Sequence, residues 1–164
     1  MSAVFSDDSV AHIDAKFRLM EEADLDEVMA IETAVYPYPW TRGIFFDCLK
    51  IGYLCLVLEQ DKKIVAYAVL SIALSIKEAH LLTIVVPTEK QNKGYGKIIL
   101  NEMIRLAKTD DIKTMYLEVR VSNTKASQIY QNRGFNELGI RDNYYPAEQG
   151  REDALIFALD LSFE

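Results

Sequence analysis

The segment Gln91-Asn92-Lys93-Gly94-Tyr95-Gly96 decides the fold, because it joins an extended run to a helix. The run before it is Thr83-Ile84-Val85-Val86, whose β-branched residues are typical of a strand. After it, apolar side chains cover so much of a helix from about Gly96 to Lys108 that this helix must lie on a sheet. Two glycines spaced by one residue let successive backbone N–H groups point into one concavity, and the helix adds its positive dipole end. The segment therefore predicts an anion site at a strand-to-helix turn.

The charges around this turn indicate which anion it binds. Lys90, Lys93 and Lys97 crowd the helix start, where cations are unfavourable unless an anion offsets them. In a chain of formal net charge −7, such a local basic cluster indicates a phosphate-bearing ligand. The spacing fits no nucleotide motif, because there is no Gly-Lys-Ser/Thr and no third glycine at dinucleotide spacing. Taken alone, the loop fits equally well a glycine-rich turn with solvated lysines.

Turn and capping residues divide the rest of the chain into short elements. Asp24, Thr41 and Asn123 are expected helix N-caps, the Tyr36–Pro39 segment ends the first helix, and Gly134 is a left-handed C-cap. Strands are expected at residues 15–20, 53–60, 64–75, 79–86, 114–119, 135–145 and 153–161. Helices are expected at residues 24–35, 41–49, 96–108 and 125–132. The order βααβββαβαββ predicts a mixed α+β fold of helices against one sheet.

Length and composition limit the class of protein. With 164 residues, we expect one domain over residues 15–164 and a flexible extension over residues 1–14. No apolar run reaches the length of a membrane span, and the first residues lack the pattern of a secretory signal. Cys48 and Cys55 have no metal or redox spacing, so we expect a cytoplasmic protein without a metal. The acidic balance argues against nucleic-acid binding and suits a cationic macromolecular substrate, although it also simply favours solubility.

Residues downstream of the loop carry a family resemblance. Gln-x-x-Gly-x-Gly after this strand, with Asn123, Tyr130 and Gly134-Phe135 further on, resembles the GNAT superfamily of acyl-CoA-dependent acetyltransferases. The resemblance implies a mixed central sheet flanked by helices, with acetyl-CoA as the acetyl donor. It also implies that loop amides bind the CoA pyrophosphate and that the preceding strand pairs with the pantetheine arm. The cofactor-binding residues it implies are Ile84, Val85, Val86, Asn92, Lys93, Gly94, Tyr95, Gly96, Lys97 and Asn123.

Further motifs are similar to one family within this superfamily, the RimI family. They are Pro39-Trp40-Thr41, Leu117-Glu118-Val119-Arg120-Val121-Ser122-Asn123, Ile129-Tyr130-Gln131-Asn132-Arg133-Gly134-Phe135, Arg141-Asp142-Asn143-Tyr144-Tyr145-Pro146 and Gly150-Arg151-Glu152-Asp153-Ala154. This resemblance implies acetylation of the N-terminal alanine of bacterial small-subunit ribosomal protein eighteen, through its basic N-terminal peptide. Thr83, Pro87 and Asp142 depart from the family pattern, and these departures bear on peptide selectivity more than on the chemistry.

Two residues are candidates for proton transfer. Glu118 is expected on the sheet face opposite Met115, Leu117 and Val119, where it either pairs with Arg120 or a neighbouring strand, or accepts a proton from an amine. Tyr130 is expected on a short helix, either as a core aromatic or as a proton donor. The resemblance makes Glu118 the proton acceptor and Tyr130 the donor to the leaving thiolate.

The remaining predictions concern the substrate. The segment from Tyr144 and Tyr145 to Arg151 and Asp153 is the expected lip for a basic peptide, although an ordinary aromatic hairpin has the same sequence character. Trp40, in the early Pro-Trp-Thr motif, is a further expected substrate-binding residue. His12 and His80 are interpreted as structural or incidental. Two other functions stay open: acetylation of a small amine or a lysine side chain, and a CoA-binding module without catalysis.

Overall fold

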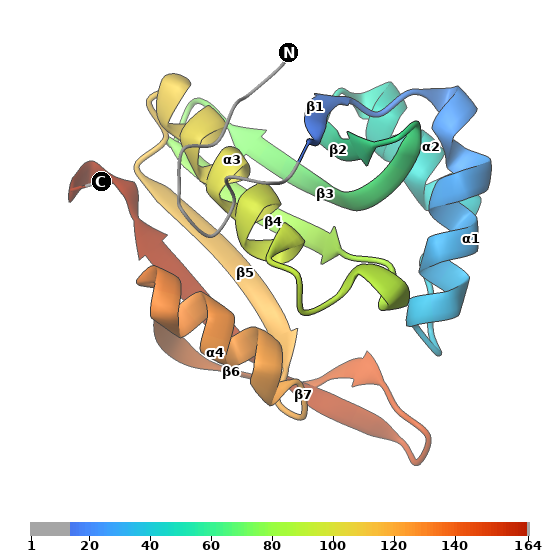
Figure 1. Cartoon of the computed structure of the whole chain (residues 1–164). Coiled ribbons are helices and arrows are strands. Elements are labelled where there is room, and N and C mark those ends of the chain that lie inside the picture. The colour runs from blue at the N-terminus through green and yellow to red at the C-terminus, as the bar shows by residue number, and fades with distance from the viewer. Residues whose placement is uncertain (1–13, 164) are drawn as a thin grey trace. The chain divides into compact units, whose positions relative to one another are not determined.

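The computed structural model describes residues 14–163, and its element order is the predicted βααβββαβαββ. The predicted flexible extension covers residues 1–14, and all of it but Asp14 lies outside the described residues. His12 is among these undescribed residues. The strands are β1 Lys16–Leu19, β2 Leu54–Gln60, β3 Lys63–Ala73, β4 Glu78–Val85, β5 Thr114–Arg120, β6 Asn136–Pro146 and β7 Arg151–Asp160 (Figure 1). The helices are α1 Leu25–Val35, α2 Arg42–Ile51, α3 Tyr95–Thr109 and α4 Thr124–Arg133, with 3-10 turns at Glu22–Asp24, Thr88–Lys90 and Leu161–Phe163.

The strands hydrogen-bond in the order β1-β2-β3-β4-β5-β7-β6. β4 and β5 pair in parallel, whereas β1 with β2, β2 with β3, β5 with β7 and β6 with β7 are antiparallel. The predicted mixed α+β fold is therefore confirmed. The parallel register covers Glu78–Leu81 of β4 against Thr114–Leu117 of β5, and both strands continue beyond it.

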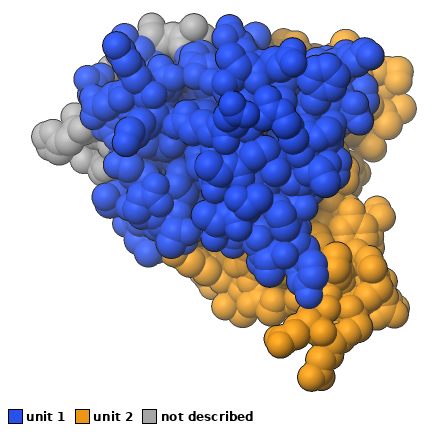
Figure 2. All heavy atoms as spheres, turned by 90° about the vertical axis from the view of Figure 1, so that its right-hand side faces the viewer, with its two compact units in different colours: residues 1–71, 83–103 blue, residues 72–82, 104–164 orange. Residues whose placement is uncertain are grey.

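Contacts divide the chain into two compact units, coloured separately in Figure 2. Unit 1 consists of residues 1–71 and 83–103, and unit 2 of residues 72–82 and 104–164. The expectation of one domain over residues 15–164 stays a prediction. No helix among residues 14–163 is long and apolar enough to cross a membrane.

The core of unit 1 lies around β2 and β3. The strands join at Asp61 and Lys62, whose φ angles of 51° and 60° suit the tight hairpin turn that the right-handed strand twist favours. Residues 64–70 are all buried, which is typical of a strand covered on both faces. α2 begins at Thr41, whose side chain accepts a hydrogen bond from the Ile44 N–H, and ends at Gly52 with φ 89°. The predicted N-cap at Thr41 is thus confirmed.

Unit 2 is built on β5, β7 and β6. Burial alternates along β5, with Met115, Leu117 and Val119 inward and Glu118 on the opposite face, as predicted. α4 begins at Asn123 and ends at Gly134, whose φ of 109° favours glycine. β7 begins at residue 151, two residues earlier than expected, because Arg151 and Glu152 pair with Pro146 and Tyr145 of β6.

Candidate active site

The anion loop, residues 91–97, lies in unit 1 and consists of the end of the β4–α3 connection and the first residues of α3 (Figure 1). Its φ angle is positive at Asn92 (62°) and Gly94 (91°), on either side of Lys93. α3 begins directly afterwards, and the Ile98 N–H donates to the Gly94 carbonyl at 3.1 Å. The Gln91 side chain fixes the start of the loop by donating to the Val86 carbonyl at 3.1 Å. The loop thus turns the chain from strand into helix within a few residues.

The exposed surface of this loop is polar and basic. Asn92, Lys93, Gly94 and Lys97 are exposed, and the first turn of α3 holds no acidic side chain. Positive φ angles in such a turn, next to the free N–H groups of a helix start, form an anion-binding concavity. These features make the loop suitable for a phosphate group.

The other predicted cofactor residues in unit 1 differ in what they expose. Tyr95 is 6% exposed and its hydroxyl donates to Gln60 Oε1 at 2.6 Å, so its side chain anchors the helix and only its backbone is placed for a ligand. Val85 is buried, whereas Ile84 and Val86 are partly exposed. A Cβ added at Gly96 would lie 3.8 Å from Val86 Cγ2, which is an ordinary van der Waals contact.

The Glu118 cluster, consisting of His80, Glu118 and Arg141, lies in unit 2. The Glu118 side chain is 7% exposed and its Oε2 contacts His80 Nε2. Its Oε1 lies 3.7 Å from Arg141 Nη2, a distance too long for a hydrogen bond but short enough for charge attraction. The cluster thus holds a nearly buried carboxylate between two basic groups.

His80, which was interpreted from the sequence as structural or incidental, contacts Glu118 in the structure. His80 stands opposite Tyr116 in the parallel register of β4 and β5, and Glu118 follows Tyr116 on the same face of β5. The alternation along both strands places the two side chains on one surface. Sequence alternation alone could have put His80 on the polar face of β4, but its partner depends on strand register, which no local pattern encodes.

Arg120 does not pair with Glu118. Its Nη1 donates to the Pro146 carbonyl at 2.8 Å and to Glu152 Oε2 at 3.1 Å, and its guanidinium lies 4.6 Å from the centre of the Tyr145 ring. Hydrogen bonds from Ser122, with a smaller contribution from Arg120, lower the pKa of Glu152. Arg120 therefore fixes the β6–β7 hairpin.

The predicted substrate lip is this same hairpin, and its polar side chains contact its own backbone. Arg151 donates to the carbonyls of Asn143 (2.7 Å) and Tyr144 (2.8 Å), and Asp153 Oδ1 accepts from the Asn143 N–H at 2.9 Å. The rings of Tyr144 and Tyr145 meet edge to face at 4.8 Å. Arg151 and Asp153 thus shape the lip, and direct contact of either residue with a peptide stays a prediction.

Asn123 is the N-cap of α4, and Tyr130 lies within this helix. Asn123 Oδ1 accepts from the Ala126 N–H at 3.1 Å, which confirms its expected role as N-cap. Tyr130 is 8% exposed and its ring packs against Phe135 at 5.6 Å and Phe157 at 6.3 Å. Tyr130 is therefore a core aromatic, and its role as a proton donor stays a prediction.

Trp40 lies in unit 1 on the segment that leads into α2. Its backbone N–H donates to Glu32 Oε2 at 2.9 Å, and its ring lies 5.2 Å from that of Phe45. Glu32 is 2% exposed and also accepts from the Tyr67 hydroxyl at 2.6 Å. Sequence reasoning missed Glu32, because a single acid within an amphipathic helix gives no sign that it is buried.

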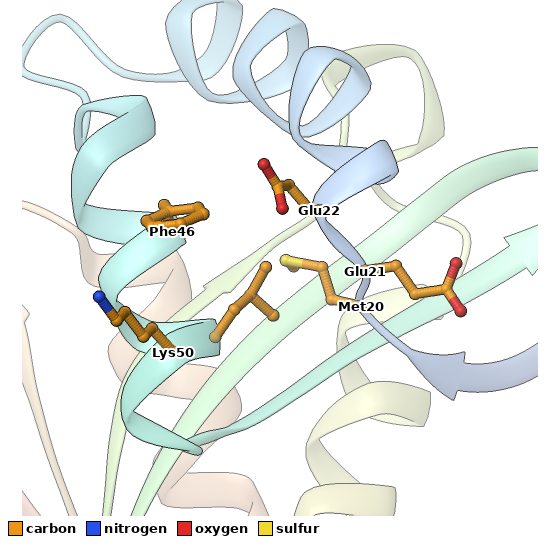
Figure 3. Close-up of a pocket in the computed structure, with 6 residues that line it drawn as sticks. Met20, Glu21, Glu22, Phe46 and Lys50 are labelled. Atoms are coloured by element: carbon orange, nitrogen blue, oxygen red, sulfur yellow. The ribbon is translucent and has the colours of Figure 1, made fainter.

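A separate shallow depression of about 440 Å³ lies in unit 1, between α2 and the segment that joins β1 to α1 (Figure 3). Its lining residues are Met20, Glu21, Glu22, Phe46, Leu49 and Lys50. None of the predicted site residues is among them. The depression is therefore distinct from the anion loop and from the Glu118 cluster.

Comparisons with known proteins agree with these features. Residues 25–135 match the model of the acetyltransferase (GNAT) family. The chain is 38% identical to the [ribosomal protein bS18]-alanine N-acetyltransferase of Salmonella typhimurium over 88% of its own length and 96% of that protein. The same-named protein of Escherichia coli K12 is 38% identical over 87% of this chain and 95% of its own.

Solved structures give the same result. The crystal structure of the ribosomal-protein-S18-alanine N-acetyltransferase from Escherichia coli superposes with a TM-score of 0.84 at 36% identity, covering 90% of this chain and 94% of that one. The structure of Ard1 from Thermoplasma volcanium has a TM-score of 0.81 at 20% identity over 90% of this chain and 98% of its own, and it shows the fold alone. The chain therefore belongs to the GNAT family of N-acetyltransferases and, within it, to the RimI group.

Proposed function

We propose that this protein transfers an acetyl group from acetyl-CoA to the N-terminal α-amine of ribosomal protein bS18, at an N-terminal alanine. The observation that carries the proposal is the 38% identity to bS18-alanine N-acetyltransferases, which extends over 88% of this chain and 96% of the relative. An identity of that extent leaves no large insertion or missing segment in which a different substrate site would be built. A cytoplasmic location follows from a ribosomal substrate and is part of the same proposal.

The anion loop is proposed to bind the pyrophosphate of acetyl-CoA. The backbone N–H groups of residues 92–97 and the start of α3 supply donors, and Lys93 and Lys97 supply positive charge. Residues 84–86 are proposed to pair with the pantetheine arm through backbone groups. This is supported by the register of β4 with β5, which covers residues only up to Leu81 of β4. Asn123 is proposed to add a contact to CoA beside its capping role.

Glu118 is proposed to take the proton from the substrate ammonium. An N-terminal amine has an ordinary pKa of about 7.7–8, compared with about 10.4 for lysine, so one carboxylate acting directly or through water suffices. The neutral amine then attacks the thioester carbonyl, and the tetrahedral intermediate collapses by breaking the C–S bond. Tyr130 is proposed to give its proton to the CoA thiolate, and the proton that the amide nitrogen loses restores the tyrosine.

The β6–β7 hairpin and Trp40 are proposed to receive the peptide. Tyr144 is 39% exposed and can stack on the peptide or its basic side chains. Arg151 and Asp153 hold the hairpin backbone in place through the contacts described above. The net charge of −7 favours a basic partner over nucleic acid.

An amine panel tests the substrate class. The protein is incubated with acetyl-CoA and either a basic peptide that starts with alanine, a peptide that starts with proline, free lysine or a polyamine, and products are identified by mass. We expect acetylation of the alanine peptide. Turnover confined to lysine or to the polyamine would instead select the small-amine alternative.

Variants of the proposed proton-transfer residues test the mechanism on the same peptide. Glu118→Gln and Tyr130→Phe should each lower kcat by about 10²-fold or more, since positioned acid–base groups contribute about 10²–10⁴-fold. Binding of acetyl-CoA should persist in both variants. If both variants turned over like the wild type, neither residue would be a proton-transfer group.

A further inference from the structure

The contact between His80 and Glu118 has no role in the mechanism proposed so far. His80 lies on β4 and Glu118 on β5, both within unit 2. The His80 side chain is 36% exposed, whereas that of Glu118 is 7% exposed. Solvent therefore reaches the imidazole much more readily than the carboxylate. The polar contacts of a carboxylate this enclosed are made mainly with protein groups.

The donors available to Glu118 can be named. Among residues 14–163, its polar contacts are His80 Nε2 at Oε2 and Arg141 Nη2 at Oε1. The guanidinium of Arg141 lies 3.7 Å away, on a side chain that is 54% exposed, and it also lies 5.6 Å from the centre of the Tyr144 ring. Arg141 supplies charge, therefore, but not a hydrogen bond that would fix the carboxylate in one orientation.

The groups around His80 and Glu118 indicate that His80 is the residue that orients the Glu118 carboxylate. Tyr116 stands opposite His80 in the register of β5, Glu78 precedes His80 by two residues on the same face of β4, and Arg141 approaches Glu118 from β6. The β7 residue opposite Glu118 is Ile156, which has no polar side chain. Of these groups, His80 alone makes a hydrogen-bond contact with the carboxylate.

We propose that His80 is a positioning residue, whose Nε2–H donates to Glu118 Oε2 and thereby holds the carboxylate turned so that Oε1 faces the substrate amine. Occupation of Oε2 leaves Oε1 as the acceptor, so the amine proton is transferred to one defined oxygen. The inference rests on the proposed function of Glu118 as proton acceptor.

Two substitutions at His80 separate orientation from simple packing. The amide nitrogen of a glutamine can reach the position of Nε2 and donate the same hydrogen bond, whereas an alanine cannot. We expect His80→Ala to lower kcat for the alanine-starting peptide about 10- to 100-fold, the loss expected from a misplaced reacting group. The KM for acetyl-CoA should change less than about threefold, since the side-chain contact of His80 is with Glu118. His80→Gln should recover most of the lost kcat.

Glu78→Gln, on the same face of the same strand as His80, serves as matched control and should leave kcat unchanged.

The outcomes distinguish this proposal from the proposed function. Wild-type kcat in His80→Ala, or equal loss in the alanine and glutamine variants, would overturn the positioning role. Glu118→Gln is measured in parallel, and wild-type turnover in that variant would show that the proposed base is wrong, whatever His80 does. If His80→Ala fails to fold, judged by circular dichroism, His80→Gln still decides, because a tenfold or larger loss of kcat in a folded glutamine variant contradicts the proposal.

Discussion

The Tyr67 hydroxyl donates a 2.6 Å hydrogen bond to the carboxylate of Glu32, which is 2% exposed. The second oxygen of Glu32 accepts from the Trp40 N–H at 2.9 Å, so one buried side chain links α1, β3 and the segment that begins α2. Burial, together with the hydrogen bond to Glu32, raises the pKa of Tyr67. This link fixes the segment that carries Trp40, a predicted substrate residue.

Tyr67→Phe should therefore destabilise the protein by about 1.5–3 kcal/mol, because it removes a hydrogen bond to a buried charged group. Chemical denaturation followed by the fluorescence of Trp40, the single tryptophan, measures the effect. Tyr53→Phe is the matched control, since among residues 14–163 the Tyr53 hydroxyl has no hydrogen bond. Equal stability of the two variants would count against the role assigned to Glu32.

The ion pair between Arg18 and Asp24 gives a prediction about pH. Arg18 binds Asp24 through two hydrogen bonds of 2.7 and 2.8 Å, and this pairing lowers the pKa of Asp24 from 3.8. Because the pKa is lower in the folded state, the stabilisation is complete above the unfolded pKa and is lost as pH falls through the folded one. Asp24→Asn should cost about 1–2 kcal/mol at neutral pH.

That difference in the free energy of unfolding should stay constant down to about pH 5 and shrink below about pH 4. Urea denaturation at a series of pH values measures it for wild type and variant. Asp47→Asn, at an exposed position of α2, controls for the loss of one negative charge. A difference that is the same at pH 3 and pH 7 would show that the ion pair is not its source.

The left-handed conformation of Gly94 makes the anion loop sensitive to a single methyl group. A Cβ at Gly94 would meet no atom within 4 Å, so strain at φ +91° is the whole expected effect of Gly94→Ala on the free protein. The strain should amount to about 1–2 kcal/mol. Because the loop would relax away from its concave shape, the KM for acetyl-CoA should rise several-fold.

The control for this variant is Gly139→Ala on β6, where φ is not positive and the added Cβ also meets no atom within 4 Å. Its stability and its KM for acetyl-CoA should match those of the wild type. Unchanged affinity for acetyl-CoA in Gly94→Ala, measured by calorimetry, would contradict the assignment of the loop to the cofactor.

Asn123 allows the capping role to be separated from the proposed contact with CoA. Serine caps helices about as well as asparagine, so Asn123→Ser should keep the free energy of unfolding within about 0.5 kcal/mol, whereas Asn123→Ala should lose about 0.5–2 kcal/mol. If the amide also contacts CoA, both variants raise the KM for acetyl-CoA. A serine variant with wild-type KM would restrict Asn123 to capping.

Local sequence patterns predicted the parts of this molecule that depend on neighbouring residues. The alternation along residues 114–119 placed Glu118 on the face opposite Leu117, and the capping residues Thr41 and Asn123 were identified correctly. The element order also followed, because helix-ending residues such as Gly134 and the Tyr36–Pro39 segment, together with β-branched runs, mark the elements.

What the sequence did not predict depends on contacts between residues far apart in the chain. His80 meets Glu118 across 38 positions, and Arg120 meets Glu152 across 32. Which charged residue pairs with which is set by strand register, and the register is set by the packing of the whole sheet. The nearest candidate partner in sequence, Arg120 for Glu118, was for that reason the wrong one.

The central claim is that the protein acetylates an N-terminal α-amine, and the position of the acetyl group tests it most directly. A basic peptide that starts with alanine and contains internal lysines is incubated with acetyl-CoA and the protein, and the product is fragmented by mass spectrometry. The account predicts one acetyl group on the alanine α-nitrogen and no reaction when that nitrogen is already blocked. Acetylation of the lysine side chains, with the α-amine left free, would contradict it.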